Sequence, residues 1–505
     1  MTYDFTFDPQ KYKYPIDLEF LKDNGYIKKI VDSIVFVKGI ENAGMYELVK
    51  INDNYSGIVL ELGTELAAVG LLENNHNIVE GMPVRLEKKE VGIRLPQKFG
   101  GMVLNVLGEP QYHTQKDEQP YISMDKIQPL FNSASPIIDI APVTRSFEMG
   151  TALIDSVIPI GKGQRQLIVG DRQTGKTQLT INAIINQKGR DVACIYCGIG
   201  QKTVQIMNVV KLLKEAGAYD YTTIVASNAG DSIINQYLAP YAAAALAEYL
   251  RDQGKDVVVV YDDLSKHADA YRTLSLLFGR TPGREAYPGD TFYIHSSLLE
   301  RAGQLQETKG GGSITALPII ETLSDDVTSY IPSNVISITD GQLFLKSSLF
   351  LSGQKPAIDV GISVSRVGGN AQCHLIRNLS RGLSLILSQY EEIKELLVFN
   401  SDLNEKDIKV YKKGVLLLEL FKQDVHQLYS LPELAMLLFA VKNDCLLEVD
   451  IKLIPKLREF LSINAKEQED IWQMLNKSLN DSDFSKANSK LLTQFIAKTK
   501  EKFLC

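Results

Sequence analysis

The spacing of hydrophobic and polar residues along this chain first indicates a small β-structure. Between residues 25 and 94, short runs rich in apolar residues alternate with breaks that contain Gly or Asn, as in SIVFVKGI, SGIVLELG and VRLEKKEVGIRLP. Short strands at such regular spacing predict an antiparallel barrel. No residue pattern in this region indicates a chemical site.

From residue 95 to residue 375, continuous apolar runs alternate with segments of helical periodicity. The runs RQLIVG, DVACIYCGIG, YTTIVASNAG and DVVVVYDD predict buried strands, whereas TQLTINAIINQKG and the Ala-rich APYAAAALAEYLRDQGK predict helices. Strands that alternate with helices are typical of a parallel sheet covered on both faces. The predicted fold class of this region is therefore α/β.

Residues 376–505 mix charged and apolar residues at a period near 3.6, as in EIKELLVF and IPKLREFLSI, and predict a helical bundle. The last segment, KANSKLLTQFIAKTKEKFLC, predicts a basic amphipathic helix, for which a solvated surface is favoured over a membrane or partner contact. Residues 1–24 form an extension in which Pro9 and Pro15 argue against one continuous helix. The pattern thus divides the chain into residues 1–24, 25–94, 95–375 and 376–505.

Composition narrows the class of protein. The chain is 45% hydrophobic and 23% charged, as is usual for soluble globular proteins, and carries a net charge of −7. Without a basic excess, nucleic-acid binding driven by phosphate contacts is disfavoured. The chain lacks both an apolar run of about 18 residues and a signal-peptide core, so we expect it in the cytoplasm, beside a membrane partner.

Cysteine and histidine do not indicate a metal site. The five cysteines are sparse and odd in number, which argues against a disulfide framework. Cys194 and Cys197 form a C-x-x-C, but zinc would need a second pair, so two core thiols are the favoured interpretation. His267 and His295 have no second ligand at metal spacing and are interpreted as structural or solvent-facing.

The strongest chemical signal is GDRQTGKT, which lies between a predicted strand and a predicted helix. It matches G-x-x-x-x-G-K-[ST], a loop whose backbone N–H groups surround phosphate at the positive end of a helix. The context on both sides disfavours a chance Gly-rich turn. The candidate nucleotide-binding residues are Gly170, Asp171, Arg172, Gln173, Thr174, Gly175, Lys176 and Thr177.

The same motif predicts the roles of two residues and requires a third. Lys176 is expected to reach the β- and γ-phosphates, and the Thr177 hydroxyl to ligate Mg²⁺. A carboxylate near the magnesium is expected at the end of a neighbouring strand. Asp262 directly follows the apolar run of DVVVVYDD and is the candidate, whereas Asp263 is interpreted as a helix or loop cap. ATP or ADP with Mg²⁺ are the cofactors expected.

Several long motifs together resemble the alpha subunit of the F-type ATP synthase head. They are PIGKGQR (159–165), GDRQTGKT, GREAYPGD (283–290), ALPIIET (316–322), IPSNVISITDGQ (331–342) and VGISVSRVGG (360–369). The resemblance extends from about residue 25 to about residue 440. It implies a RecA-like P-loop domain with an N-terminal β-barrel and a C-terminal helical domain.

The resemblance also implies an assembly. In this family three alpha and three beta subunits alternate in a ring around a rotating shaft, and the ring attaches to a stator and a membrane sector. The terminal segments of this chain depart from the usual alpha pattern, including KEQEDIWQMLNKSLNDSDFSKANSK. An alternative within the family is therefore a diverged, ATP-hydrolysing relative, of the kind found in mollicutes, that drives a process other than synthesis.

One glutamine bears on whether the chain hydrolyses its nucleotide. Hydrolysis needs a carboxylate to polarise the attacking water, and in the catalytic beta subunits this glutamate follows a glycine at the end of the strand after the P-loop helix. Here Gly200 and Gln201 stand in that place. A neutral amide orients a water but does not accept its proton, although some GTPases use glutamine to orient water. The resemblance therefore implies a chain that holds Mg-ATP without hydrolysing it.

Further roles are implied only by the resemblance. Arg366, in SVSRVGG, matches an arginine that reaches into the beta active site and stabilises the transition state; the alternative interpretation of Arg366 is a surface or salt-bridged arginine.

Alpha subunits place two glutamines near the adenine. Gln423 of FKQDVHQLYS matches the first, and Gln427 matches the second only if two residues are inserted. Arg172 and Gln173 match alpha rather than beta subunits and are expected near the phosphates or the base edge.

Two other classes of protein compete with this interpretation. A self-sufficient ring motor, such as a secretion ATPase or an RNA translocase, would need a carboxylate at Gln201, and an RNA translocase would favour basic loops. A scaffold that has lost nucleotide binding would have no reason to keep Lys176, Thr177 and Asp262. The favoured hypothesis is a non-catalytic, regulatory nucleotide-binding subunit.

Overall fold

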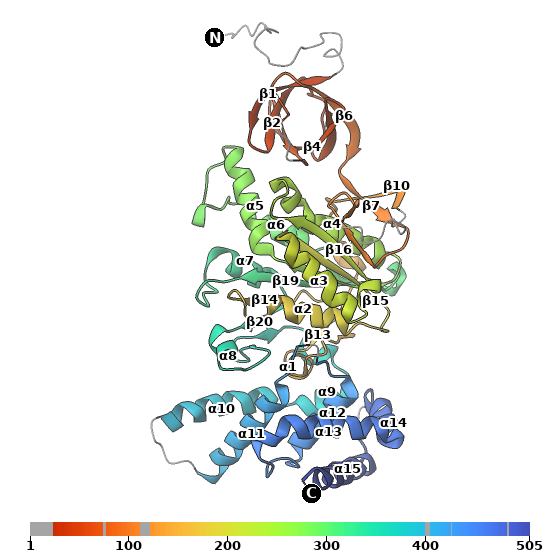
Figure 1. The fold of residues 1–505 in the computed structure, drawn as a ribbon, viewed down its shortest axis with the longest axis vertical. Helices are drawn as coiled ribbons and strands as arrows, with labels where there is room; N and C mark the ends of the chain where they lie inside the picture. The colour runs from red at the N-terminus through yellow and green to blue at the C-terminus, as the bar shows by residue number, and fades with distance from the viewer. Residues whose placement is uncertain are drawn as a thin grey trace. The chain divides into compact units, whose positions relative to one another are not determined.

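The computed structural model describes residues 24–73, 77–111, 122–398, 404–425, 427–481 and 484–504. The predicted extension at residues 1–24 therefore lies, apart from Asn24, outside the described residues. The chain folds into two compact units, each made from separate stretches of sequence. Figure 1 labels the helices and strands along the chain. The first unit comprises Met1–Ser135 and Ala193–Arg301, and the second comprises Pro136–Val192 and Ala302–Cys505.

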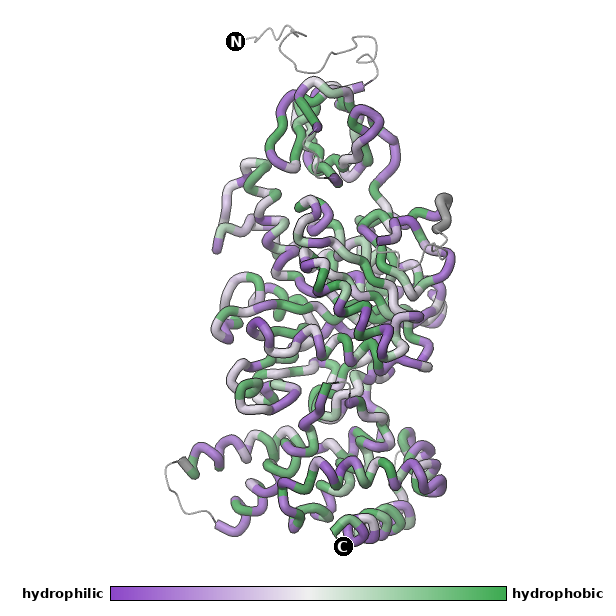
Figure 2. Tube along the Cα trace, viewed as in Figure 1, coloured by the Kyte–Doolittle hydropathy of each residue, from purple (hydrophilic) through white to green (hydrophobic). Residues whose placement is uncertain are grey.

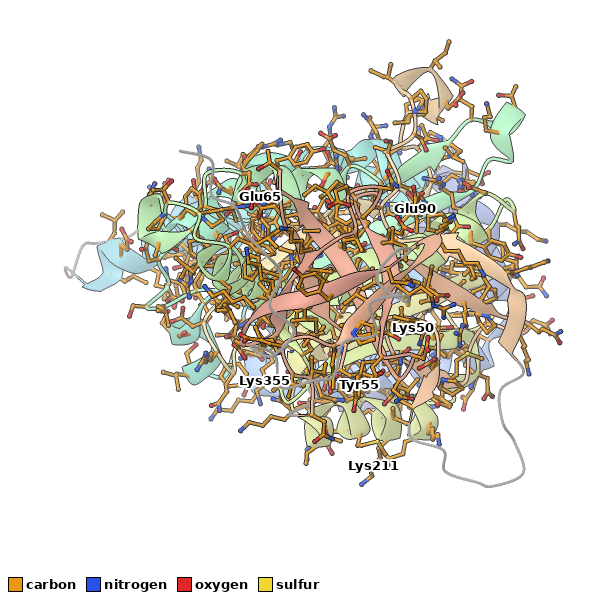
Figure 3. The ribbon with its side chains drawn as sticks, turned by 90° about the horizontal axis from the view of Figure 1, so that it is seen from above. Lys50, Tyr55, Glu65, Glu90, Lys211 and Lys355 are labelled. Atoms are coloured by element: carbon orange, nitrogen blue, oxygen red, sulfur yellow. The ribbon has the colours of Figure 1, made fainter. Side chains whose placement is uncertain are left out.

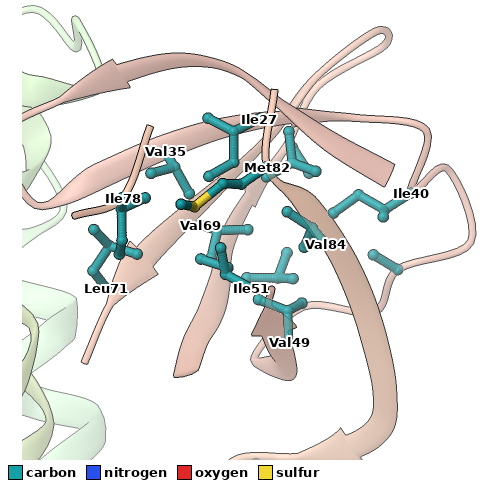
Figure 4. Packing of buried hydrophobic residues seen from close by; sticks show 14 residues of the cluster. Ile27, Val35, Ile40, Val49, Ile51, Val69, Leu71, Ile78, Met82 and Val84 are labelled. Atoms are coloured by element: carbon teal, nitrogen blue, oxygen red, sulfur yellow. The ribbon is translucent and has the colours of Figure 1, made fainter. Parts of the chain in front are cut away.

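The first unit begins with the predicted antiparallel barrel. Six strands close on one another in the order β1-β2-β5-β4-β3-β6. Their bounds are β1 Gly25–Val31, β2 Ile34–Lys38, β3 Glu47–Ile51, β4 Tyr55–Leu62, β5 Ala67–Leu71 and β6 Pro83–Glu90. Buried and partly exposed residues alternate along β3, and hydrophobic and polar residues are interspersed along the barrel strands (Figure 2). Ile27, Val49 and Val69 are among the side chains that fill the barrel (Figure 4).

The rest of the first unit is an α/β layer. β15 (Val192–Gln201), β16 (Thr222–Asn228) and β8 (Met102–Leu104) run parallel, and β17 (Asp256–Asp262) lies on the other side of β15. Cys194 and Cys197 are buried in β15, as the core-thiol interpretation predicts. The remaining elements are β7 Gly92–Pro96, β9 Pro110–Gln111, β10 Ile122–Pro129, α3 Thr203–Glu215, α4 Ile233–Arg251, α5 Leu264–Leu277 and α6 Thr291–Leu299.

Helix α4 occupies the centre of this layer because it is apolar almost all round. It packs against β16, β17 and α5, and its Ala-rich segment Ala242–Ala245 is buried. His267 of α5 and His295 of α6 are also fully buried, with ring centroids 5.4 Å apart. The structural alternative for these two histidines is therefore correct, and the solvent-facing one is wrong.

The second unit contains its own set of parallel strands. β14 (Leu167–Gly170) runs parallel to β19 (Ser313–Glu321) on one side and to β20 (Gly341–Leu345) on the other. Helices α2 (Lys176–Ile185) and α7 (Tyr330–Ile338) pack against β14 and β19. The shorter elements are β11 Ile140–Ala141, β12 Ser146–Phe147, β13 Ile160–Gly161, β18 Gly303–Leu305, β21 Val364–Ser365, α1 Ala152–Val157 and α8 Ser347–Leu351.

The second unit ends in the predicted helical bundle. Its helices are α9 His374–Ser380, α10 Leu383–Val398, α11 Glu405–Phe421, α12 Leu431–Lys442, α13 Ile454–Glu467, α14 Glu469–Ser478 and α15 Lys486–Leu504. The apolar face of α15 is not free, since Leu492 and Ile496 are buried and Phe503 packs on Phe460 of α13. Among the described residues, the helices are all too short or too polar to cross a membrane.

A buried ion pair in the first unit gives a prediction about stability. Arg301 donates to Glu248 and to the carbonyl of Leu130, and both charged side chains are almost inaccessible to water. Replacing Arg301 by Gln leaves a buried carboxylate without its cation, which we expect to cost about 3–5 kcal/mol. Urea unfolding of the purified chain measures this difference.

The matched control is Arg85, whose ion pair with Asp53 is exposed. Arg85→Gln should cost less than about 1 kcal/mol, because surface pairs contribute little. Equal destabilisation by the two variants would contradict the assigned importance of the buried pair.

Candidate nucleotide-binding site

The predicted phosphate loop connects the end of β14 to the start of α2, as the motif requires. A Cβ atom at Gly170 would lie 2.3 Å from the carbonyl oxygen of Leu345, so only glycine fits beside β20 there. Gly175 adopts a φ of +96° in open space, so its backbone conformation, rather than crowding, favours glycine. Both Gly170 and Gly175 therefore stand at positions of the loop where the structure favours glycine.

Lys176 lies within the curve of this loop. Its Nζ donates to the carbonyl oxygens of Gly170 at 2.8 Å and Asp171 at 2.5 Å, and the side chain is buried. The loop thus holds a cation at the N-terminus of α2, where the helix dipole also favours an anion. Thr177 occupies the next position of the helix and is partly exposed.

Asp171 anchors the loop to the segments that follow β19 and β20. Its carboxylate accepts hydrogen bonds from the Thr322 hydroxyl, the Asp325 N–H and the Ser347 hydroxyl. Burial acts to raise the pKa of Asp171, but these hydrogen bonds and the charge of Lys176 lower it overall. Asp171 therefore stays ionised and serves the loop as a structural acceptor.

The other loop residues divide between the surface and the interior. Arg172 is exposed and its Nε donates to Glu321 at 3.0 Å. Gln173 is exposed and has a φ of 63°. Thr174 is buried, and its hydroxyl donates to the carbonyl of Asp171.

A cavity of about 260 Å³ opens beside the loop, entirely within the second unit. Its apolar wall is formed by Leu179, Leu345, Phe350, Pro356 and Val425. Polar groups line it at a few points, among them Gln178, Asn182 and Lys355, the last of which is labelled in Figure 3. An apolar cavity with a few polar groups next to a phosphate loop is suited to the flat base of a nucleotide.

The structure places the two candidate adenine glutamines differently. Gln423 lines the cavity, but its Oε1 accepts from the Ala152 N–H and its Nε2 donates to the carbonyls of Gly150 and Gln427. Its amide is thus engaged in holding the turn before α1. The Gln427 side chain is not part of the cavity lining, since its Oε1 accepts from Arg458 and its Nε2 donates to Glu459.

Sequence reasoning missed the apolar wall of this cavity. Phe350 and Pro356 lie outside every motif, and Val425 lies between the two glutamines of FKQDVHQLYS; each is an ordinary apolar residue. The one available signal is their position, since Phe350 and Pro356 follow shortly after the strand that borders the phosphate loop.

Asp155 of α1 supports the turn that Gln423 contacts. Its two carboxylate oxygens accept from the N–H groups of Met149 and Gly150, each at 2.9 Å. Burial raises the pKa of Asp155 to about 7, although these backbone hydrogen bonds oppose the rise. A buried carboxylate therefore fixes the backbone behind the cavity wall.

A second group of candidate residues meets within the first unit, at the ends of β15 and β17. Gln201 donates from its Nε2 to the Asp262 Oδ1 at 3.2 Å and to the Asp262 carbonyl at 3.1 Å. The Tyr196 hydroxyl donates to the Asp262 Oδ2 at 2.6 Å. Burial and the charge of Asp262 raise the pKa of Tyr196 well above its usual value, so this donor keeps its proton.

The structure confirms the interpretation of Asp263 as a helix cap. It is the residue before α5, and its side chain accepts from the Lys266 N–H at 2.8 Å. Asp262, which accepts from Gln201, and its neighbour Asp263, which caps α5, therefore have separate tasks.

Arg366 follows β21 in a turn that is held from several sides. The Ser365 hydroxyl donates to the Pro159 carbonyl and accepts from Gly368, and the Arg366 N–H donates to the Asp340 carbonyl. The Arg366 side chain is exposed, and no ion pair joins it to another described residue. A firmly held backbone thus presents a guanidinium to solvent.

Two family models match the chain. Residues 150–365 match the nucleotide-binding domain of the ATP synthase alpha/beta family, and residues 372–499 match the C-terminal domain of the ATP synthase alpha/beta chain. The first match contains the phosphate loop, Gln201 and Asp262, and it ends directly before Arg366. The second contains both candidate adenine glutamines.

Individual relatives agree with these matches. ATP synthase subunit alpha 1 of Listeria welshimeri is 49% identical over 490 residues, which cover 97% of each chain. The protein of the same name from Listeria monocytogenes serovar 1/2a is 48% identical over 493 residues, or 98% of each chain. ATP synthase subunit alpha of Mesomycoplasma hyopneumoniae strain J is 46% identical over 433 residues, 86% of this chain and 84% of its own. The Listeria similarity thus extends into the terminal segments that depart from the usual alpha pattern.

The raised pKa of Asp155 predicts how stability depends on pH. Because the folded state keeps the proton up to about pH 7 while an unfolded aspartate loses it near pH 4, the free energy of unfolding should fall as pH rises between these values. The contribution of Asp155 reaches at most about 1.4 kcal/mol per pH unit. Asp155→Asn removes it, so the stability difference between wild type and variant should shrink from pH 5 to pH 8 in urea unfolding.

Asp53→Asn is the control, because Asp53 is exposed on the barrel and its loss should leave the pH profile unchanged over this range. A wild-type-minus-Asp155→Asn difference that stays constant with pH would show that Asp155 does not titrate as described.

Proposed function

This chain belongs to the ATP synthase alpha/beta family, and on that premise we propose that it is a non-catalytic, regulatory ATP-binding alpha-type subunit of a rotary F-type ATPase. Its nucleotide would be ATP or ADP, held by the phosphate loop of Gly170–Thr177 with the base in the adjacent cavity. The buried Lys176 cation and the apolar wall at Phe350 and Pro356 support this placement.

The observation that carries the non-catalytic assignment is the hydrogen bond from Gln201 to Asp262. An ionised glutamate at position 201 has no N–H to donate, and it would place a second negative charge about 3 Å from the Asp262 carboxylate. The local arrangement therefore favours an amide and lacks a base that accepts a proton from water. The same observation counts against a self-sufficient ring motor, because such a motor needs that base.

Magnesium contacts are proposed from motif positions. Hard oxygen donors suit Mg²⁺, which commonly takes one or two protein ligands together with phosphate oxygens and water. The Thr177 hydroxyl and the Asp262 carboxylate occupy the expected positions of the loop and of the following strand end. The hydrogen bonds from Gln201 and Tyr196 would orient the Asp262 carboxylate for this role.

The partners are proposed from the family. Beta-type subunits would alternate with this chain in a ring of three and three around a rotating shaft subunit, with a stator and a membrane sector attached. The complex would lie at the cytoplasmic face of the cell membrane. Arg366 would act in trans as an arginine finger for the neighbouring beta-type subunit, and its exposed side chain on a held turn supports this role.

Arg366→Lys tests the proposal in the assembled complex. The variant should bind Mg-ATP on this chain as the wild type does, because Arg366 is not part of the phosphate loop or of the base cavity. Hydrolysis by the complex with its beta-type partner should fall by about 10³–10⁵, the usual effect of losing an arginine finger. Fluorescent-nucleotide binding and phosphate release measure the two quantities.

Two control variants allow this experiment to be interpreted. Lys176→Ala should abolish nucleotide binding by this chain, and Arg85→Lys, on the barrel, should change neither quantity. Near-normal hydrolysis by an assembled Arg366→Lys complex would refute the proposed role of Arg366.

A further inference from the structure

A second cavity in the second unit is distinct from the nucleotide site. Its volume is about 540 Å³, and it shares no lining residue with the base cavity. Three parts of the chain surround it: the end of α1 with Pro159, the turn that contains Ser365 and Gly368, and α9 with the start of α10. We call this cavity the basic pocket, after His374, Arg377 and Arg381 in its lining.

The ionisable side chains that line the basic pocket are all basic. The three basic side chains lie among serine, glycine, asparagine, glutamine and apolar residues, and no acidic residue belongs to the lining. The carboxylates that usually neutralise clustered arginines are therefore missing from its walls. An anion entering the pocket would meet two guanidinium groups without competition from a neighbouring carboxylate.

The guanidinium groups of this pocket also differ from the others in the chain. The other arginines, apart from Arg366, each form an ion pair or donate to a backbone carbonyl among the described residues. Within the part of the chain that the structure describes, Arg377 and Arg381 have no such partner for their side chains. Their hydrogen-bonding capacity is available to a ligand.

The turn at Gly369 shapes one wall of the pocket. A Cβ atom at Gly369 would lie 3.1 Å from the Arg377 Nε, so the absence of a side chain lets the guanidinium lie close against this turn. Gln372 also lines the pocket and is fixed, because its Nε2 donates to the carbonyls of Asp155 and Ser156. The pocket therefore has held walls as well as cationic groups.

We propose that the basic pocket binds a small phosphate-bearing anion, with Arg377 and Arg381 as its charge partners. Planar guanidinium groups match the oxygens of phosphate in a bidentate geometry. The cavity is wide enough for more than one phosphate group, so a diphosphate is the class that uses both arginines. This site is separate from the phosphate loop and does not depend on the proposed subunit role.

The test uses inorganic pyrophosphate as the probe and the full chain with Lys176→Ala, which removes the phosphate loop as a competing site. Calorimetric titration should still show one bound pyrophosphate. Adding Arg377→Gln and Arg381→Gln should weaken this binding by at least about 100-fold, since each change removes charge-assisted hydrogen bonds. Adding Arg377→Lys and Arg381→Lys instead should weaken the binding less, because the charges remain and only the bidentate geometry is lost, and residual binding shows that the pocket still folds.

A control matched for charge is Arg85→Gln with Lys211→Gln on the same background. Both residues are exposed and far from this cavity in sequence, and Lys211 lies at the outer surface of α3 (Figure 3). This variant should bind pyrophosphate as the background does. Loss of all pyrophosphate binding with Lys176→Ala alone, or equal binding by the Arg377→Gln, Arg381→Gln variant, overturns the proposal. Failure of nucleotide binding to the unmodified chain would instead bear on the phosphate loop.

Discussion

The nucleotide site of this chain depends on the close approach of β20 to the end of β14. The Leu345 carbonyl leaves no room for a side chain at position 170. Because Gly170 has none, the backbone can pass this carbonyl and turn into the loop that holds Lys176. The same strand supplies Leu345 to the cavity wall and leads to Phe350. One backbone contact thus determines both where phosphate would lie and where the base would lie.

Around this contact, polar groups are used mainly to hold backbone. Asp171 ties the loop to the segment after β19, Asp155 ties the turn before α1 to α1 itself, and Gln423 ties this turn to the segment after α11. In the first unit, Gln201 and Tyr196 together satisfy both oxygens of Asp262. Such fully bonded networks rigidify the positions of charged groups, which suits a site that retains a nucleotide better than one that must pass a proton.

Sequence alone predicted the parts of this protein that local pattern controls. The barrel strands, the buried strands with their following helices, the phosphate loop and the Asp263 cap all follow from spacing and short motifs. The cavity wall does not, because Phe350 and Val425 meet only through long-range packing. The contact of Gln427 with Arg458 and the acceptor role of Asp155 likewise depend on tertiary neighbours. The basic pocket combines residues from the end of α1 to α10, so no local pattern could predict it.

The most direct test of the central claim is to measure Mg-ATP binding and phosphate release together on the purified chain without any partner. The account predicts saturable binding at one site per chain and no release of phosphate above the uncatalysed rate. Steady hydrolysis by the isolated chain, lost on Lys176→Ala, would contradict it, because the Gln201 site would then support catalysis without a carboxylate base.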